Sequence, residues 1–324
     1  MSVSDESYTT EEVAKLLKIS KLTVYDLLKK GDLPSYRVGK QMRVDASDLE
    51  AFKMRSKGTF ASELPLPSSD LMPVRSTIHN GIQQQAAGGE RQLVITGQDV
   101  SLDILSRYME GRTQGVRPLR SYTGSMDGLV SMYRGESDIV SSHLWDGDTG
   151  EYNLPYIRKL FVGQSYLVVR LLTRSAGMYV RTGNPKGILG WDDLTRPGIR
   201  IANRETGSGA RVLLDEQMRV RHVDASNLNG YLQEEASHLA VAGKVASHEA
   251  DVGIGIANAA HLVGNIDFIP LVQEHYDIMM LKRPQNKAWI ASVLSIVQSD
   301  AFRNELRMIQ GYDLALTGRV MFET

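Results

Sequence analysis

The sequence has no cysteine, which excludes disulfide bonds, thiolate metal sites and cysteine nucleophiles. No stretch reaches the roughly 18 uninterrupted apolar residues that a membrane-spanning helix needs, so we expect no membrane partner. The first residues are acidic and contain no apolar run, so no secretory signal is expected either. Together these absences favour a cytoplasmic protein.

An excess of charge of one sign is also missing, because 37 Lys and Arg stand against 38 Asp and Glu. Any contact with nucleic acid must therefore use a local basic surface. What the chain does have is length and apolar content: 324 residues, of which 42% are hydrophobic. That is enough for about two or three globular domains with buried cores.

The N-terminal part of the chain carries the signals of two short helices and a hairpin. Thr9 and Glu12 form a capping box that starts a first helix, and Ser20 caps a second helix after a short turn. Residues 36–44 alternate around Gly39-Lys40, which predicts a β-hairpin. Two helices followed by a hairpin are the elements of a winged helix-turn-helix.

This unit resembles the excisionase-type, MerR-like DNA-binding domains over nearly all of residues 8–52, in the stretch YTTEEVAKLLKISKLTVYDLLKKGDLPSYRVGKQMRVDASDLEAF. The resemblance implies that double-stranded DNA is a partner, read by the second helix in the major groove and touched by the wing. The expected DNA contacts on these two elements are Lys21, Thr23, Tyr25, Arg37, Lys40 and Arg43. Taken singly, each cation is better explained as an ordinary solvated side chain.

Composition marks a boundary after this unit. Residues 58–90 are rich in proline, glycine and small polar residues, which predicts a linker that is either a solvated spacer or partly helical. We therefore divide the chain into a DNA-binding domain at 1–57, a linker at 58–90 and a ligand-binding domain at 91–324.

From residue 91 onward, short apolar runs alternate with helical patterns, which predicts an α/β fold with parallel strands. Turns with Gly and Ser precede helices at 97–101, 123–126 and 206–210. The N–H groups and the dipole at the start of a helix attract anions. Each turn alone is explained as an ordinary helix cap. Together, facing one another across a cleft, the turns would surround one small anion.

The same region resembles the type 2 periplasmic-binding-protein-like domain found on some bacterial regulators and on molybdopterin-biosynthesis proteins. The resemblance covers most of residues 92–282, through GESDIVSSHLWDGDTGEYNLPYIRKL, RTGNPKGILGWDDLTRPGIRIANRETGSGARVLLDE, HLAVAGKVASHEADVGIGIANAA and DFIPLVQEHYDIMML. It implies two lobes, with an inserted lobe at about 183–272 and crossings near 175–181 and 277–281. It also implies molybdate or tungstate as the ligand, held by backbone N–H and hydroxyl groups.

On this basis the expected ligand contacts are Thr123, Ser125, Ser208, Gly209 and Ser101. Three further residues each have two interpretations. Arg211 either binds the anion or points away, and His143 either donates to it or caps a loop. Tyr276 either closes the cleft or packs among other aromatic rings.

Two carboxylates argue against an oxyanion. Asp99 and Glu205 would repel a bound dianion unless they face away or pair with a cation such as Arg204. Their presence keeps a larger organic, partly cationic or molybdenum-cofactor-related ligand open as the alternative.

The expected function is a one-component transcription regulator that binds DNA and senses an oxyanion, with no further cofactor and no metal. An enzyme on the same fold is the remaining alternative. No HExxH, GxSxG or GxxxxGK[ST] motif occurs, so no catalytic residue is assigned.

Reversing the charges of Arg37, Lys40 and Arg43 together is expected to abolish DNA binding and to leave the fold intact, because phosphate contacts carry much of the affinity. Each lost contact should flatten the log–log salt dependence by roughly one unit. Fluorescence anisotropy with a DNA fragment selected by the wild-type protein, over a range of salt concentrations, measures both quantities. Unchanged affinity and slope in the triple variant would show that the wing assignment is wrong.

We also expect a homodimer. Residues 1–57 contain eleven Lys and Arg and nine Asp and Glu, a net charge of +2, so one copy should bind DNA weakly. Two copies on paired half-sites remedy this weakness. Sedimentation at micromolar concentration, with and without DNA, tests the expectation, and a single species of 35.9 kDa in both conditions would contradict it.

Overall fold

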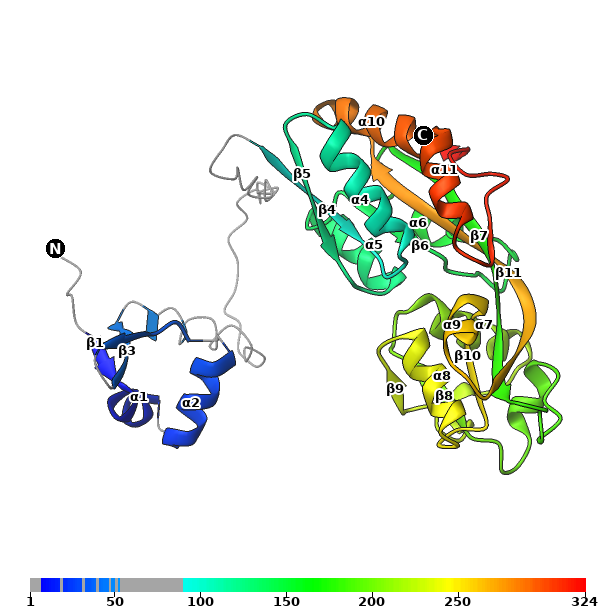
Figure 1. The fold of residues 1–324 in the computed structure, drawn as a ribbon, viewed down its shortest axis with the longest axis horizontal. Coiled ribbons are helices and arrows are strands. Elements are labelled where there is room, and N and C mark those ends of the chain that lie inside the picture. The colour runs from blue at the N-terminus through cyan, green and yellow to red at the C-terminus, as the bar shows by residue number, and fades with distance from the viewer. Residues whose placement is uncertain are drawn as a thin grey trace, which may run out of the picture. The chain divides into compact units, whose positions relative to one another are not determined.

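The computed structural model divides the chain into two units, residues 1–77 and 78–324 (Figure 1). The described residues are 7–17, 20–30, 33–38, 41–46, 48–49, 52 and 90–324. The expected linker therefore lies outside the described residues, apart from its last residue. No helix within these described ranges is long and apolar enough to span a membrane.

The N-terminal unit has the elements expected from its capping signals, preceded by one short strand. They are β1 (Ser7–Thr9), α1 (Thr10–Leu17), α2 (Lys21–Lys30), β2 (Tyr36–Val38) and β3 (Gln41–Asp45). The N–H of Thr9 donates to Oε2 of Glu12 at 2.8 Å, and the N–H of Thr23 donates to Oγ of Ser20 at 3.1 Å. The capping box and the second cap are thereby confirmed. β2 and β3 pair as the expected hairpin, and β1 pairs with β3 on the other side.

The first lobe of the second unit is built from two separate parts of the chain. The earlier part supplies β4 (Arg91–Thr96), α4 (Ser101–Arg112), β5 (Val116–Ser121), α5 (Ser125–Arg134), β6 (Ile139–Ser142) and α6 (Leu154–Leu160). The later part supplies η3 (Pro284–Asn286), α10 (Lys287–Gln298), α11 (Asp300–Arg307), β12 (Tyr312–Asp313) and β13 (Val320–Glu323). One apolar core joins the two parts, since Leu105 of α4 lies in it with Val293 of α10 and Phe302 of α11.

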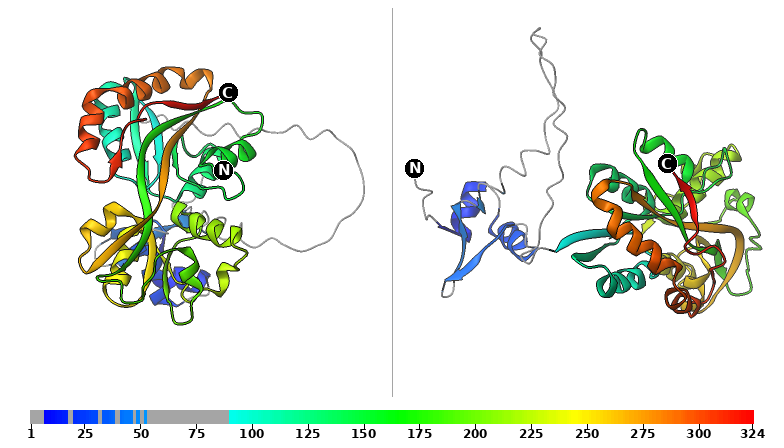
Figure 2. Two further views of the ribbon diagram at one scale, coloured as in Figure 1. Left: turned by 90° about the vertical axis from the view of Figure 1, so that its right-hand side faces the viewer. Right: turned by 90° about the horizontal axis from the view of Figure 1, so that it is seen from above.

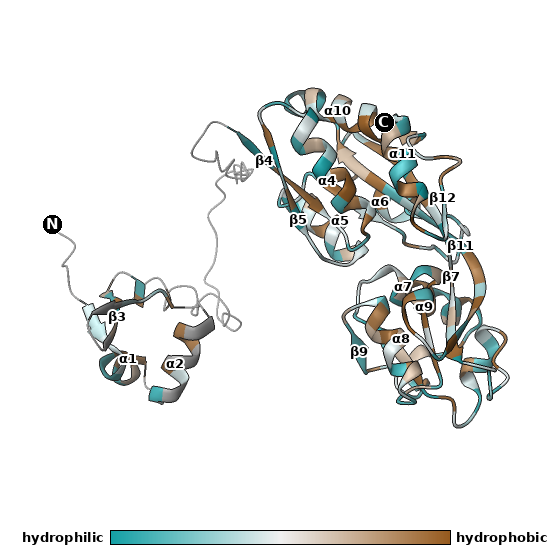
Figure 3. Ribbon diagram, viewed as in Figure 1, coloured by the Kyte–Doolittle hydropathy of each residue, from teal (hydrophilic) through white to brown (hydrophobic). Residues whose placement is uncertain are grey.

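The second lobe lies between these two parts in sequence. It contains η1 (Trp191–Thr195), β8 (Ile201–Arg204), α7 (Gly209–Val220), η2 (Ala225–Asn227), β9 (Glu234–Glu235), α8 (His238–Ala246), β10 (Val252–Ile256) and α9 (Ala257–Leu262). β8 pairs in parallel with both β9 and β10, as β4 does with β5 and β6 in the first lobe. The expected parallel strands are therefore present in each lobe. Figure 3 shows hydrophobic residues, in brown, on α8 and α9 and hydrophilic residues on β9.

Two long strands connect the lobes: β7 (Tyr166–Arg181) and β11 (Ile266–Leu281). They pair antiparallel along their length, and the views of Figure 2 show them running side by side from one lobe to the other. The first half of β7 pairs with β12 and β13, whereas its second half pairs with β10. The ten-stranded sheet is therefore mixed. Eight of its strands lie in the order β5-β4-β6-β11-β7-β10-β8-β9, and β12 and β13 lie off this path, each paired with β7.

Both crossings differ from the expectation. Residues 176–180 pair with β10 and so belong to the second lobe, whereas residues 173 and 174 pair with β12 of the first, which places the first crossing around residues 174–176. Residues 277–280 pair with β6 and so belong to the first lobe, which places the second crossing earlier, around residues 272–276. The physical reason is that one continuous strand serves both lobes, so the end of its apolar run does not mark the crossing.

Gly177 allows the two crossing strands to approach each other. A Cβ at this position would lie 2.0 Å from the carbonyl oxygen of Ile269 on β11, far inside van der Waals contact. The neighbouring atom is backbone, so it cannot move aside without breaking the pairing of Gly177 with Pro270. The strand pair therefore requires glycine here.

Replacing Gly177 with valine is expected to lower the free energy of unfolding by more than about 3 kcal/mol, at or beyond the upper end for overpacked sites. Urea unfolding followed by circular dichroism measures the loss. The matched control is Gly243→Ala on α8, where an added Cβ meets no atom within 4 Å. That change should stabilise the helix by about 0.5 to 1 kcal/mol. Equal stability of Gly177→Val and wild type would contradict the close approach.

Candidate functional site

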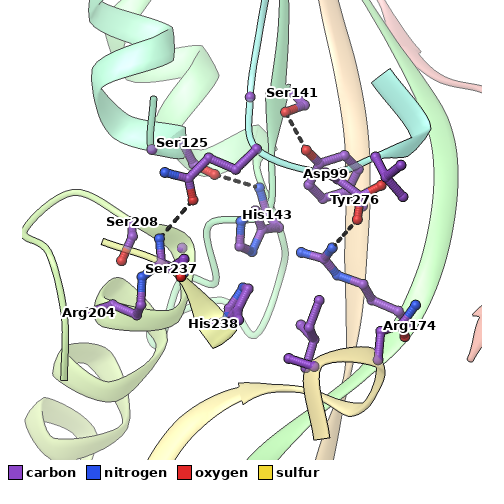
Figure 4. Close-up of a pocket in the computed structure, with 18 of the residues that line it drawn as sticks. Asp99, Ser125, Ser141, His143, Arg174, Arg204, Ser208, Ser237, His238 and Tyr276 are labelled. Carbon is purple, nitrogen blue, oxygen red and sulfur yellow. Dashed lines mark hydrogen bonds and ion pairs between the residues drawn. The ribbon is translucent and has the colours of Figure 1, made fainter. Parts of the chain in front are cut away.

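A cavity of about 490 Å³ lies between the two lobes of the second unit (Figure 4). Each lobe contributes residues from the ends of its strands and the starts of its helices. The lining includes these residues from the two lobes and the crossing strands: Asp99, Thr123, Ser125, His143, Arg174, Arg204, Ser208, Gly209, Ser237, His238 and Tyr276.

The turns at 123–126 and 206–210 meet across the cleft. The N–H of Met126 at the start of α5 donates to the carbonyl of Gly207 at 3.0 Å. A Cβ on Gly124 would lie 3.1 Å from the backbone of Ser208, so the two turns are in close contact. The structure thus brings together two turns that the sequence analysis expected to share a ligand.

The hydroxyl groups at this end of the cavity keep protons that they can donate. Oγ of Ser125 accepts from the backbone N–H of His143 at 3.3 Å, and Oγ of Ser208 accepts from the N–H of Arg211 at 3.3 Å. Oγ1 of Thr123 is buried and has no hydrogen-bond partner in the described part of the chain. A buried hydroxyl without a partner is costly, so a ligand acceptor is the natural group to fill its place.

Four described helices of eight or more residues begin at the cavity: α4, α5, α7 and α8. Each N-terminus carries roughly +0.5 elementary charge, so together they contribute roughly +2. The start of α8 was not anticipated as part of the site. Its signal is present in the sequence, because Ser237 precedes an apolar helical run and its Oγ accepts from the N–H of Ala240 at 3.1 Å.

The base of the cavity holds a buried arginine between two carboxylates. Nη1 of Arg174 lies 2.5 Å from Oδ2 of Asp99, and Nε donates to Oε1 of Glu274 at 2.7 Å. The guanidinium also lies 4.7 Å from the ring centre of Tyr276. Sequence reasoning missed Arg174 and Glu274, which are far apart in the chain and become neighbours only through the register of β7 and β11.

His143 lies between this network and the polar turns. Its Nδ1 is 2.9 Å from Oε2 of Glu274, and its ring packs against that of Tyr276 at 5.4 Å. On the other side, a Cβ on Gly209 would lie within 2.3 Å of the imidazole, so only glycine fits there. Burial raises the pKa of Glu274, but Arg174 and His143 lower it further, and the pKa ends well below its usual range. Glu274 is therefore a fixed negative charge.

The two carboxylates that argue against an anion are both paired. Asp99 contacts Arg174 and also accepts from the hydroxyl of Tyr312 at 2.7 Å. Nη2 of Arg204 donates to Oε1 of Glu205 at 2.6 Å. Burial raises the pKa of Glu205, but the hydrogen bond and charge of Arg204 bring it below the ordinary value. Glu205 thus pairs with Arg204, which is one of the two conditions under which it does not oppose a bound anion.

Two of the expected ligand contacts do not line the cavity. Ser101 is fully buried at the start of α4, where its N–H donates to Oδ1 of Asp99 at 2.8 Å. Arg211 points away, pairing with Asp215 at 3.2 Å and stacking on Tyr231 at 3.9 Å. The first turn of a helix presents its N–H groups along the axis while its long side chains project sideways, which explains the placement of Arg211.

Tyr276 lines the base of the cavity, where its hydroxyl lies 2.7 Å from Oγ of Ser141. Its ring packs against that of His143, as the second interpretation has it, and closure of the cleft by Tyr276 stays a prediction. In the described chain no group of three or more His, Asp or Glu side chains is placed to hold a metal ion.

The expected DNA contacts are described only in part. Lys21 and Thr23 are exposed near the start of α2, where Lys21 forms an ion pair with Glu11. Nη1 of Arg43 donates to Oγ of Ser7 at 3.1 Å, which ties β3 to β1. Lys40 and the side chains of Tyr25 and Arg37 lie outside the described residues.

Comparison with known proteins agrees with this architecture. Residues 106–298 match the PBP superfamily domain, and residues 7–57 match the helix-turn-helix domain. A histidine kinase sensor domain with similarity to periplasmic binding proteins has a similar fold, with a TM-score of 0.51 at 10% identity over 69% of this chain and 98% of that one.

Two relatives are similar in sequence. The protein YvgK of Bacillus subtilis (strain 168) is 47% identical over 321 residues, which cover 98% of both chains. A sulfate-binding protein of Synechococcus elongatus is 35% identical over 115 residues, or 33% of this chain and 31% of that protein. The chain therefore belongs to the PBP superfamily, with a helix-turn-helix domain preceding its PBP domain.

Proposed function

We propose that this protein is a transcription regulator whose helix-turn-helix domain binds double-stranded DNA and whose PBP domain senses a small oxyanion, with molybdate and tungstate as the ligands to test first. The observation that carries the proposal is the meeting of two hydroxyl-bearing helix starts, Ser125 of α5 and Ser208 before α7, from opposite lobes at one end of the cavity.

The electrostatics of the cavity favour an anion held by neutral donors. Arg174 and Arg204 are already paired with carboxylates, so they leave no free cation to bind a ligand by a salt bridge. The helix starts supply the positive potential instead, and hydroxyl and N–H groups supply the hydrogen bonds. The similarity to a sulfate-binding protein supports a tetrahedral oxyanion, because sulfate has that shape.

The DNA-binding half of the proposal rests on the helix-turn-helix domain and on the exposed start of α2. Lys21 and Thr23 lie in the first turn of this helix, the part that contacts base edges in helix-turn-helix proteins. Contacts of the hairpin with phosphate groups would add to the DNA affinity. Binding of two copies to paired half-sites would raise it further, which is why we propose a homodimer.

Ligand binding can act on DNA binding only by favouring one arrangement of the lobes over another. Contacts that depend on the arrangement already cross the cleft, since Nη2 of Arg204 donates to Oε1 of Gln98 at 2.7 Å and Nη2 of Arg219 pairs with Asp148 at 2.8 Å. An anion between Ser125 and Ser208 adds to these contacts and stabilises the arrangement in which the turns meet.

Changing Ser125 or Ser208 to alanine is expected to weaken molybdate and tungstate binding by about 1 to 3 kcal/mol, because each removes a hydrogen bond to a charged ligand. Gly209→Val should abolish binding, since its side chain would collide with His143. Isothermal titration calorimetry measures the affinities, and anisotropy with selected DNA measures whether the ligand changes DNA binding.

The matched control is Ser299→Ala, which removes the N-cap of α11 as Ser208→Ala removes that of α7, yet lies outside the cavity lining. It should lower stability and leave ligand affinity unchanged. The oxyanion assignment is wrong if Ser125→Ala and Ser208→Ala bind as tightly as wild type. A ligand that binds without altering DNA affinity would contradict the regulatory role.

A further inference from the structure

The cavity is much larger than the polar end at which the oxyanion is proposed to bind. Its volume is about 490 Å³. A tetrahedral anion with four oxygens takes roughly 120 Å³ if each oxygen is given the ~30 Å³ of a water molecule. Pockets of about 300 to 1,000 Å³ are typical of sites for organic small molecules. An inorganic oxyanion would therefore leave most of this cavity unfilled.

The cavity exceeds the volume of an oxyanion even though the two lobes are in contact. The lobes already touch at the contact of Met126 with Gly207, at 3.0 Å, and at the hydrogen bond between Arg204 and Gln98, at 2.7 Å. A further contact joins the N–H of Gly147 in the first lobe to Oε2 of Glu216 on α7 at 2.7 Å. The remaining space thus lies between lobes that are in contact.

Apolar side chains also line the cavity. They come from both lobes and are Val100, Leu239, Ile256, Ala259, Leu262 and Ile309. The Tyr312 hydrogen bond to Asp99 holds the segment after α11 beside the start of α4, and Gly311 lies against Asn258 of α9. Side chains of both lobes therefore meet at this apolar end, which we define by the six residues above.

Several of these apolar side chains are exposed. Leu239 is 48% exposed, Val100 is 48% exposed and Leu262 is 76% exposed. Covering this apolar surface with an apolar group of a ligand lowers the free energy of the complex. A tetrahedral oxyanion has no apolar surface with which to do so.

One buried acceptor at the cavity also lacks a donor. Oδ1 of Asn258 is buried and has no hydrogen-bond partner within the described residues. A fully ionised oxyanion carries acceptors alone and cannot satisfy this oxygen.

We propose that the oxyanion group of the proposed function is carried by an organic molecule, so that the sensed ligand is an organic phosphate or phosphonate. Its oxyanion lies at the polar end, between Ser125 and Ser208, and this rests on the proposed function. Its organic body lies against the apolar end and carries an N–H or O–H donor for Asn258. The cavity volume, the exposed apolar lining and the unpartnered oxygen of Asn258 each favour a part of this ligand that an inorganic ion lacks.

The test compares three probes in calorimetry: inorganic phosphate, phenyl phosphate and 4-aminophenyl phosphate. Phenyl phosphate is expected to bind at least tenfold more tightly than inorganic phosphate, a difference of about 1.4 kcal/mol. The amino compound, which adds a donor, is expected to bind more tightly again. Molybdate is measured alongside as the inorganic ion of the proposed function.

Variants of the cavity lining test which side chains contact the phenyl ring and which contact the phosphate group. Leu239→Ser and Val100→Ser should remove the gain from the phenyl ring and leave inorganic phosphate affinity unchanged, whereas Ser208→Ala should weaken all three probes. Leu189→Ser is the matched control, because Leu189 is 75% exposed and lies outside the cavity lining. This variant should bind all three probes with wild-type affinity.

The outcomes separate the two proposals. Phenyl phosphate binding no tighter than inorganic phosphate or molybdate would overturn the organic ligand and leave the oxyanion sensor intact. The organic ligand is equally overturned if Leu239→Ser and Val100→Ser retain the full gain. If no probe binds and molybdate also fails, the oxyanion site itself is wrong.

Discussion

A buried ion pair between neighbouring strands holds the ligand-binding unit together at its centre. Arg174 on β7 and Glu274 on β11 are both almost fully buried, and they face each other where these strands pass from one lobe to the other. A buried charge that loses its partner costs about 3 to 5 kcal/mol, so neither residue can be replaced alone without a large penalty. Asp99 and His143, which also contact this pair, place the start of α4 and the end of β6 around it.

The same pair determines the chemical character of the cavity. Because one arginine faces two carboxylates, Asp99 and Glu274, the base of the cleft offers a ligand no net positive charge. Attraction for an anion then comes from the helix starts, whose N–H groups have fixed directions. Binding by directional donors selects the shape of a ligand as well as its charge. Such selection by shape suits the oxyanion sensor proposed above.

Local signals in the sequence predict the helices and turns. The site residues that these signals do not predict become neighbours only through pairing between distant strands. The helix caps formed by Thr9 with Glu12, by Ser20 and by Ser208 have partners a few residues away, so the helix starts and the turns at the cavity could be predicted. Arg174 and Glu274 stand in strands otherwise rich in apolar residues, and nothing near either residue in the sequence reveals its partner. Arg211 was ambiguous because periodicity assigns a residue to a helix but does not say what its side chain meets in the tertiary structure. The volume of the cavity also depends on how the lobes meet, which no local pattern encodes.

The attachment of the second lobe constrains how a bound molecule can be reported. Both β4, which opens the ligand-binding unit, and β13, which closes it, belong to the first lobe, and the second lobe is joined covalently to them only through β7 and β11. Around residues 272–276 of β11 these two strands pair with each other, and a pair with few flanking strands twists more than a pair inside a broad sheet. If the lobes of the proposed sensor move, we therefore expect the movement to be a twist of this strand pair. A bound ligand would then be reported as an angle between the two lobes.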